Sequence, residues 1–211
     1  MTIFNDIAEA LQNGDQQAVR DLTRKALDDG SKPADILSSG LIAGMDIIGE
    51  QFKNGDIFIP NVLIAARAMH TGLDILKPIL AETGSKPVGR FVIGTVLGDH
   101  HDIGKNLVCM LMQGKGFEVV DLGTNVSPDK FVESVKDNEI NILGMSALLS
   151  TTMSQMKDTI DKLETAGLRD KIKIMVGGGP LTQSFADEIG ADGYAPDAAS
   201  AAEKALELAA C

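Results

Sequence analysis

The sequence predicts an α/β protein in which a small helical bundle precedes a doubly wound parallel sheet. Apolar residues recur at helical spacing from residue 1 to about residue 83, whereas beyond a short linker brief apolar runs alternate with amphipathic stretches. The length of 211 residues suits a small domain joined to a medium one. We therefore place the domains at residues 1–84 and 88–211.

Helical spacing is clear in the first half, where apolar side chains follow one another at intervals of three and four residues. They include Ile36, Leu37, Leu41, Ile42, Met45, Ile48 and Phe52. Breaks near Gly14, at Gly30 to Pro33 and at Asn54 to Pro60 divide this half into about four helices, and the short connections indicate an antiparallel bundle. The segment Gly84-Ser85-Lys86-Pro87 holds two helix breakers, so we predict the domain boundary there.

Short apolar runs in the second half indicate five strands. They cover residues 91–97, 118–122, 142–146, 172–176 and 193–194. The stretches between them begin near Gly104, Ser127, Thr151, Leu181 and Pro196, and they are long enough for right-handed crossover helices. Ligands of such sheets bind beyond the carboxyl ends of the strands, near the point where strand order reverses. The loops after residues 97, 146 and 176 should therefore share one edge.

Composition disfavours several classes of protein. The formal net charge of −11 repels nucleic-acid backbones, and no basic cluster offsets it. No apolar run reaches the ~18 residues that a membrane span requires, and the first residues lack the basic and apolar regions of a signal peptide, so we expect a cytoplasmic protein. Cys109 and Cys211 support neither a disulfide framework nor a zinc site built on paired thiolates.

The segment from Gly98 to Asn106 concentrates charge, imidazole and glycine between a predicted strand and a predicted helix, where functional loops often lie. It lacks the glycine spacing of a dinucleotide fingerprint, and no Ser or Thr follows Gly104-Lys105, so nucleotide binding is disfavoured. Zinc is an alternative, since Asp99-His100-His101-Asp102 are all potential ligands. Adjacent residues, however, cannot all point at one ion.

The pattern Asp99-x-His101-x-x-Gly104 resembles the signature of the corrinoid proteins of methyltransferase systems and of the cobalamin-binding module of methionine synthase. Two further parts of that signature occur at suitable distances, Ser146-x-Leu148 after the third strand and Gly177-Gly178 after the fourth. Such proteins carry a four-helix cap ahead of a flavodoxin-like, Rossmann-type B12-binding domain. The resemblance therefore spans nearly the whole chain.

The resemblance implies a bound cobalamin or related corrinoid whose own nucleotide base leaves the cobalt, with His101 replacing it as the lower axial ligand. Asp99 would accept the second N–H of that imidazole, and Thr152 would supply the hydroxyl that completes the relay. His100 adjoins the ligand, but the spacing to Asp99 and Gly104 selects His101. Taken alone, Asp99 could equally be a helix N-cap or a loop carboxylate.

The other residues of the matched motifs are expected to line the cofactor. They are His100, Asp102, Ile103, Gly104, Ser146, Leu148, Gly177 and Gly178. Gly104 would let the backbone approach the corrin or its tail, Ser146 would hydrogen-bond the buried base of the tail, and Leu148 with the two glycines would shape its slot. A phosphate cradle at the glycines and ordinary strand-end contacts are the alternatives.

The segment from Phe52 to Pro60 resembles the part of methionine synthase that places a phenylalanine and a leucine over the upper face of the corrin. The resemblance implies that Phe52 and Ile59 shield the methyl group and swing away before a substrate arrives. The alternative is that both side chains belong to the bundle core.

The implied function is that of a methyl carrier without activity of its own. It would cycle between Co(I) and methyl-Co(III), accept a methyl group from a substrate-specific corrinoid methyltransferase and pass it to a second methyltransferase with tetrahydrofolate or coenzyme M as acceptor. A reductive activase is a further expected partner. Selectivity among methanol, methylamines, methoxylated aromatics, quaternary amines and thiols would belong to the partner enzyme. The alternatives are a B12 sensor, the B12 subunit of a carbon-skeleton mutase, and a storage protein.

Overall fold

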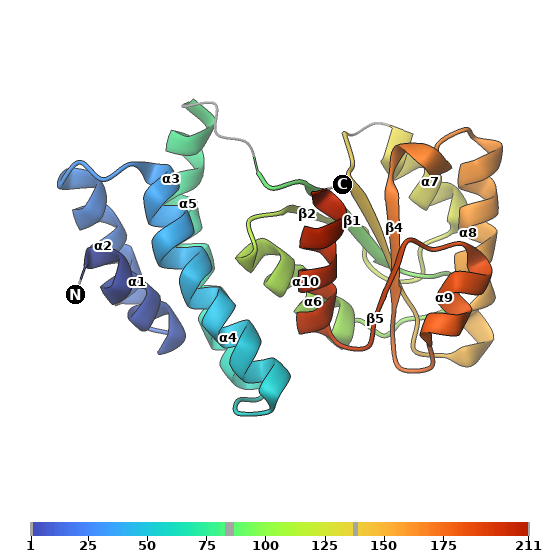
Figure 1. Ribbon diagram of the computed structural model, residues 1–211, viewed down its shortest axis with the longest axis horizontal. Coiled ribbons are helices and arrows are strands. Elements are labelled where there is room, and N and C mark those ends of the chain that lie inside the picture. Colours follow the sequence, from blue (N-terminus) through green and yellow to red (C-terminus); the bar gives the residue numbers. More distant parts are fainter. Residues whose placement is uncertain (1, 83–86, 137–138, 211) are drawn as a thin grey trace. The chain divides into compact units, whose positions relative to one another are not determined.

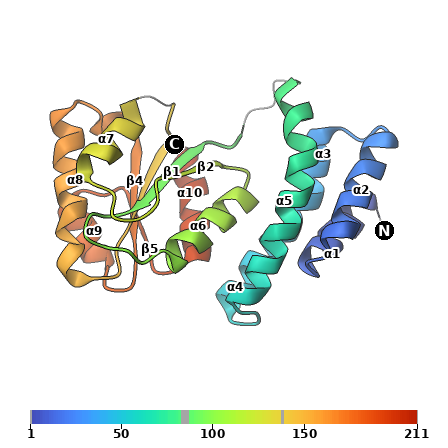
Figure 2. The same cartoon turned by 180° about the vertical axis from the view of Figure 1, so that it is seen from behind.

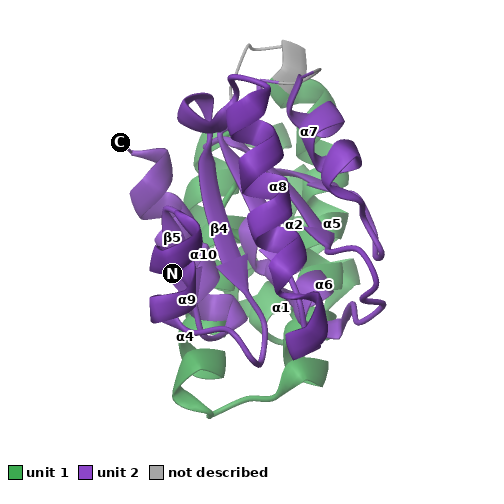
Figure 3. Ribbon diagram, turned by 90° about the vertical axis from the view of Figure 1, so that its right-hand side faces the viewer, with its two compact units in different colours: residues 1–87, 114–116 green, residues 88–113, 117–211 purple. Residues whose placement is uncertain are grey.

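The computed structural model of the protein describes residues 2–82, 87–136 and 139–210. The chain divides into two compact units (Figure 3), residues 1–87 with 114–116 and residues 88–113 with 117–211. The predicted boundary falls on residues 84–87, of which residues 84–86 lie outside the described residues.

The described part of the first unit consists of four helices (Figures 1 and 2). They are α1 (Ile3–Gln12), α2 (Gln16–Asp28), a continuous helix made of α3 (Pro33–Ile36), the π-helical η1 (Leu37–Ile42) and α4 (Ala43–Asn54), and α5 (Ile59–Glu82). Side-chain oxygens of Thr2 and Asp15 cap the amino ends of α1 and α2. Gly55 ends α4 in the left-handed conformation, with φ 78°. The predicted four-helix region is therefore present, whereas nothing in the apolar spacing signalled the π-helical segment.

Apolar side chains on the inner faces of these helices hold the first unit together. Ile7 and Leu11 of α1, Leu41 of η1 and Leu76 of α5 are all 0% exposed. Each such burial contributes about 1.5–3 kcal/mol relative to an exposed position. Although α5 extends over 24 residues, none of the helices in the described ranges combines the length and the apolar character needed to cross a membrane.

The second unit is built on a five-stranded parallel sheet, which confirms the predicted fold class. The strands are β1 (Arg90–Thr95), β2 (Glu118–Asp121), β3 (Ile142–Ser146), β4 (Lys173–Gly177) and β5 (Gly193–Ala195), in the order β2-β1-β3-β4-β5. The predicted strands all occur, β3 with both ends as predicted and the others with ends displaced by at most two residues. Strand order reverses between β1 and β3, so the loops after these two strands border the expected ligand crevice.

Helices cover both faces of this sheet (Figure 1). They are α6 (Ile103–Gly114) and α10 (Ala198–Ala209) on one face, with α7 (Pro128–Lys136), α8 (Ser154–Thr165) and α9 (Gln183–Ile189) on the other. The short 3₁₀ turns η2 (Ser150–Thr152) and η3 (Arg169–Lys171) precede α8 and β4. Helices α6 and α7 lie on opposite faces because both connections are right-handed crossovers that run in opposite directions across the sheet, from β1 to β2 and from β2 to β3.

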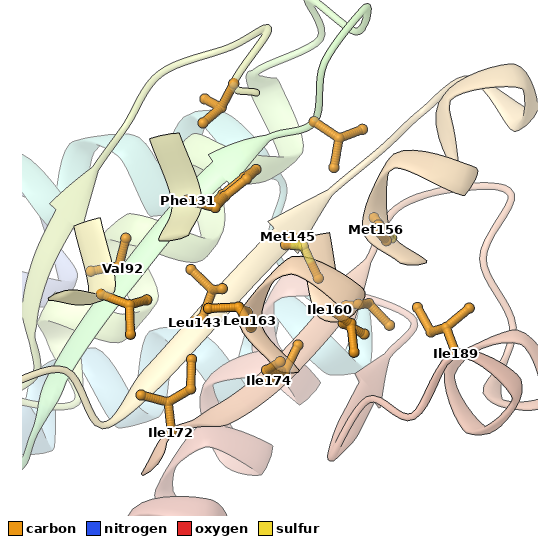
Figure 4. Close-up of a cluster of buried hydrophobic side chains, with 14 of the residues drawn as sticks. Val92, Phe131, Leu143, Met145, Met156, Ile160, Leu163, Ile172, Ile174 and Ile189 are labelled. Carbon is orange, nitrogen blue, oxygen red and sulfur yellow. The ribbon is translucent and has the colours of Figure 1, made fainter. Parts of the chain in front are cut away.

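The main core of the second unit lies between the sheet and α7 to α9 (Figure 4). Leu143 and Ile174 of the strands pack in one cluster with Phe131 of α7, Ile160 of α8 and Ile189 of α9. Burial on both faces explains why β3 is an uninterrupted apolar run instead of an alternating one. This core fixes the strand ends from which the candidate site is built.

Candidate functional site

The loop between β1 and α6 begins with a tight turn. The Asp99 N–H donates to the Val96 carbonyl (3.1 Å), and Gly98 occupies the left-handed region at φ 82°. Glycine suits this position because a Cβ makes such a conformation unfavourable. The turn directs the Asp99 carboxylate toward the segment that follows β3.

Asp99 is a buried carboxylate that ties the two loops together. Its Oδ1 accepts the backbone N–H of His101 (3.1 Å) and lies 2.7 Å from His101 Nδ1. Its Oδ2 accepts the backbone N–H groups of Leu148 (2.7 Å) and Leu149 (3.0 Å) and the hydroxyl of Thr152 (3.1 Å). The side chain is 0% exposed, so these donors replace its hydration. The structure thus brings Asp99, His101 and Thr152 together.

The pKa of Asp99 lies below its ordinary value of 3.8. Burial alone would raise it, but hydrogen bonds from the His101 ring and from the backbone N–H groups of Leu149, His101 and Leu148 outweigh burial and favour the charged form. An ionised carboxylate only accepts hydrogen bonds, so the hydrogen between the two side chains resides on Nδ1 of His101. The neutral ring then has its lone pair on Nε2, the atom that a metal ion would bind.

Exposed apolar side chains accompany His101 at this edge. The His101 side chain is 53% exposed. Leu97 after β1, Ile103 at the start of α6, and Leu148 and Leu149 after β3 are 40%, 70%, 49% and 41% exposed. A fixed imidazole on loops that expose apolar surface fits a broad, largely apolar group with a metal ion at its centre.

The ends of β3 and β4 approach each other closely. Ser146 and Gly177 are register partners at the carboxyl ends of these strands. Gly178 has φ 129°, and a Cβ built on it would lie 1.8 Å from the Ala147 carbonyl oxygen. Its lack of a side chain therefore lets β4 run against the segment that donates to Asp99. For Gly178 this backbone contact is itself a reason for glycine, apart from any ligand.

The remaining motif residues of this loop are exposed. His100 and Asp102 are exposed, and the Asp102 carboxylate accepts from the Asn106 side chain (3.2 Å). Gly104 is exposed too, with no atom within 4 Å of a built Cβ. Over the described ranges, no group of three or more His, Cys, Asp or Glu residues could hold a metal ion. The loop therefore offers one fixed imidazole instead of the ligand set of a protein zinc site.

Phe52 and Ile59 belong to the first unit. Phe52 is half-buried in α4, whereas Ile59 is 39% exposed at the start of α5. Ile59 is therefore not a buried core residue of the bundle. Contact of either side chain with a cofactor remains a prediction.

Several contacts of the site escaped sequence reasoning. The fully buried Thr95 donates its hydroxyl to the His101 carbonyl (2.9 Å). Lys105, 2% exposed, joins the start of α6 to the end of β2 through Asp121 (2.6 Å) and also bonds Asn106 (2.7 Å). Leu149 contributes its backbone N–H to Asp99. Because nearly every residue type has this group, the residue at position 149 gives no hint of the contact in the sequence. The lysine directly after Gly104 is visible in the sequence, but its burial and its contact with Asp121 are not.

We expect Asp99→Asn to destabilise the cofactor-free protein by about 2–4 kcal/mol, because an amide cannot accept from all the donors around it. The loss should depend on pH. Since the pKa of folded Asp99 is lowered, its stabilisation is complete above the ordinary value of 3.8 and is lost as the pH falls toward the folded value. Urea unfolding should therefore show a larger gap between wild type and variant at pH 7 than at pH 3. A gap that widens in acid, or one that Asp102→Asn reproduces, would contradict this.

Thr152→Ala is expected to weaken retention of the cofactor moderately. The Thr152 hydroxyl has one proton and two acceptors, Asp99 Oδ2 (3.1 Å) and the Leu149 carbonyl (2.8 Å). Its loss should speed release of the corrinoid that the resemblance implies about threefold to tenfold, as for one hydrogen bond. Thr152→Ser keeps the hydroxyl and should restore retention in the same dialysis assay. Equal loss in both variants would assign the effect to the methyl group.

Comparison with known proteins places this geometry in a family. Residues 89–203 and residues 3–77 match two families, each described as a B12 binding domain. A corrinoid protein of Desulfitobacterium hafniense is 41% identical over 211 residues, 99% of this chain and 98% of that protein. A dimethylamine corrinoid protein of Methanosarcina barkeri is 43% identical over 208 residues, 98% and 97% of the two chains. A chain of the methanol:cobalamin methyltransferase complex from Methanosarcina barkeri superposes with TM-score 0.89 at 33% identity, over 99% of this chain and 80% of that chain.

Proposed function

Because the chain belongs to the family of B12-binding corrinoid proteins, we propose that it carries methyl groups between methyltransferases on a bound corrinoid. One observation carries the proposal within the chain itself. His101 Nδ1 lies 2.7 Å from a fully buried carboxylate, so the ring is held with Nε2 left to bind cobalt. Among the described residues, no group forms a hydrogen bond with Nε2 of His101.

The residues of the carboxyl edge would hold the cofactor. His101 would ligate the cobalt, and the exposed Ile103 and Leu148 would contact apolar parts of the ring system. Ser146, Gly177 and Gly178 would line the slot for the nucleotide tail. The adjacent His100, Asp102 and Gly104 border the same face. When bound, the corrinoid supplies a cobalt ion that takes up a methyl group as Co(I) and holds it as methyl-Co(III).

The Asp99–His101 pair would set how tightly the metal is held. By accepting from Nδ1, Asp99 fixes the orientation of the ring and would strengthen Nε2 as a metal ligand. Thr152 donates to the far oxygen of Asp99 and holds the carboxylate in this role.

The helical domain, residues 1–84, would act as a lid over the domain of residues 88–211. Phe52 and Ile59, together with the neighbouring Phe58, which is 72% exposed, offer apolar surface at the junction of α4 and α5. Covering a reactive cobalt would exclude water, and the lid must move aside when an enzyme docks.

The donor enzyme would be a methyltransferase specific for a methylated amine, since dimethylamine and trimethylamine corrinoid proteins are among the relatives. The methanol:cobalamin methyltransferase complex supports a docked partner of the same general kind. A second methyltransferase would pass the methyl group to tetrahydrofolate or coenzyme M, and a reductive activase would restore oxidised cobalt. We place all of these partners, and this chain, in the cytoplasm.

The proposal can be tested with the purified chain, loaded with hydroxocobalamin and then reduced. Mono-, di- or trimethylamine or methanol is offered together with the matching methyltransferase. We expect the visible spectrum of a methylated cofactor with one donor class, formed in proportion to donor consumed. The chain without a methyltransferase is the control and should not react. A firmly bound cofactor that no donor and enzyme pair can methylate would favour the storage or sensor alternatives instead.

A further inference from the structure

We propose that Asn125 is a positioning residue that sets how firmly His101 is presented to cobalt, an inference that rests on the proposed function. Asn125 lies in the loop after β2, outside the matched sequence motifs. Two of its atoms hold the loop that carries the ligand. Its Oδ1 accepts the Gly98 N–H (2.8 Å), and its own backbone N–H donates to the Asp99 carbonyl (2.9 Å).

The backbone of Asn125 is adapted to this double contact. With φ 54° it is the one non-glycine residue in the left-handed region over the described parts of the chain. Asparagine enters this region more readily than most residues. The next residue, Val126, donates to the Thr95 carbonyl at the end of β1 (2.9 Å). In this conformation the side-chain oxygen of Asn125 faces the Gly98 N–H while its backbone N–H faces the Asp99 carbonyl.

The contact matters because Gly98, at φ 82°, lacks the Cβ that restricts the backbone of other residues. Asn125 holds the Gly98 N–H, whereas the Asp99 N–H is held separately by the Val96 carbonyl (3.1 Å). The backbone N–H and the ring of His101 both bond to Asp99, so a change at the Gly98–Asp99 turn reaches the imidazole directly. A preformed loop binds a metal more tightly than one that must be ordered on binding. Asn125 supplies that order from the separate loop after β2.

Three variants separate the contributions of Asn125. Asn125→Gly tolerates the left-handed backbone, so it keeps the N–H bond to Asp99 while it removes the side-chain acceptor. Asn125→Asp keeps an acceptor and tolerates the same backbone. Asn125→Ala loses the acceptor and strains the backbone. Asn141→Ala is the matched control, because Asn141 makes the same pair of bonds to Arg90 at the opposite end of β1, accepting its N–H (2.7 Å) and donating to its carbonyl (3.0 Å).

Two readouts with bound hydroxocobalamin test the inference, the histidine-ligated fraction in the visible spectrum and the rate of cofactor release. We expect Asn125→Gly to lower that fraction and to release cofactor about threefold to tenfold faster, Asn125→Ala to act at least as strongly, and Asn125→Asp and Asn141→Ala to match wild type. Should Asn125→Ala fail to fold, Asn125→Gly carries the test. A wild-type spectrum and release rate in Asn125→Gly, or the same change in Asn141→Ala, overturns the inference. Failure of the proposed ligand is distinct, since His101→Ala would then leave the wild-type spectrum unchanged.

Discussion

His101→Ala is expected to change the visible spectrum of bound hydroxocobalamin from a histidine-ligated to a water-ligated form. The variant removes the imidazole that Asp99 holds through Nδ1, and no second histidine is fixed in this way among the described residues. Loss of an outer-shell partner of a metal ligand commonly lowers affinity about 10–100-fold, so loss of the ligand itself should weaken retention at least as much. Spectroscopy and equilibrium dialysis of the loaded protein measure both effects.

The neighbouring histidine provides the matched control for this experiment. His100 is exposed and makes no hydrogen bond within the described parts of the chain, so His100→Ala should leave the spectrum as in wild type. The unliganded His101→Ala protein should fold but lose about 1.5–3 kcal/mol of stability, because Asp99 Oδ1 loses the ring N–H of His101 and keeps only its backbone N–H. If His100→Ala alone altered the spectrum, the assignment of the ligand would pass to His100.

The fold could be predicted largely because its periodic signals are strong. Buried parallel strands such as β3 leave unbroken apolar runs, and the breaks between helices carry glycine, proline and asparagine. The π-helical turn and the exact strand ends have no comparable signal in the sequence. The π-helical turn at Leu37–Ile42 has the same apolar spacing as its α-helical neighbours. Strand ends shifted by a residue or two because pairing with neighbouring strands, not sequence, decides where a strand stops.

The candidate site could be predicted where side chains carry the chemistry and not where the backbone does. Asp99, His101 and Thr152 were singled out from spacing and resemblance, and the structure places them within hydrogen-bonding distance. The N–H groups of Leu148 and Leu149 hold the same carboxylate, yet any residue type supplies an amide. The contact of the Leu148 side chain with the cofactor stays a prediction, whereas its backbone bond to Asp99 is a role that the sequence does not indicate.

Contacts between residues far apart in the sequence could not be predicted either. Asn125 reaches Gly98 across 27 positions of sequence, and only the pairing of β1 with β2 brings them together. The run Gly123-Thr124-Asn125 indicates a turn, but a turn between a strand and a helix is expected in any such sheet. Recognising the contact required knowledge of which loops share an edge and of the left-handed backbone at Asn125.

Gly178→Ala is expected to have the largest effect on folding among the site residues. The added Cβ would lie 1.8 Å from the Ala147 carbonyl oxygen and 2.8 Å from its carbonyl carbon, and φ 129° is itself unfavourable for alanine. The clash is with backbone, so no side-chain rotation relieves it. We expect a loss of about 3–5 kcal/mol in the free energy of unfolding and a fall in Tm of about 10 °C. Thermal unfolding of the cofactor-free protein measures this.

The same substitution should reach the ligand through the backbone. The Ala147 N–H donates to the Gly177 carbonyl (3.2 Å), and the residues directly after Ala147 donate to Asp99 Oδ2. Displacing Ala147 therefore withdraws donors from the carboxylate that holds His101, so any folded Gly178→Ala protein should retain corrinoid poorly. Gly177→Ala is the control, because its Cβ would meet only ordinary contact, 3.4 Å from the Ala195 carbonyl oxygen, and should change stability by less than about 1 kcal/mol. Equal stability losses in the two variants would show that the close approach at Ala147 is not what requires glycine at position 178.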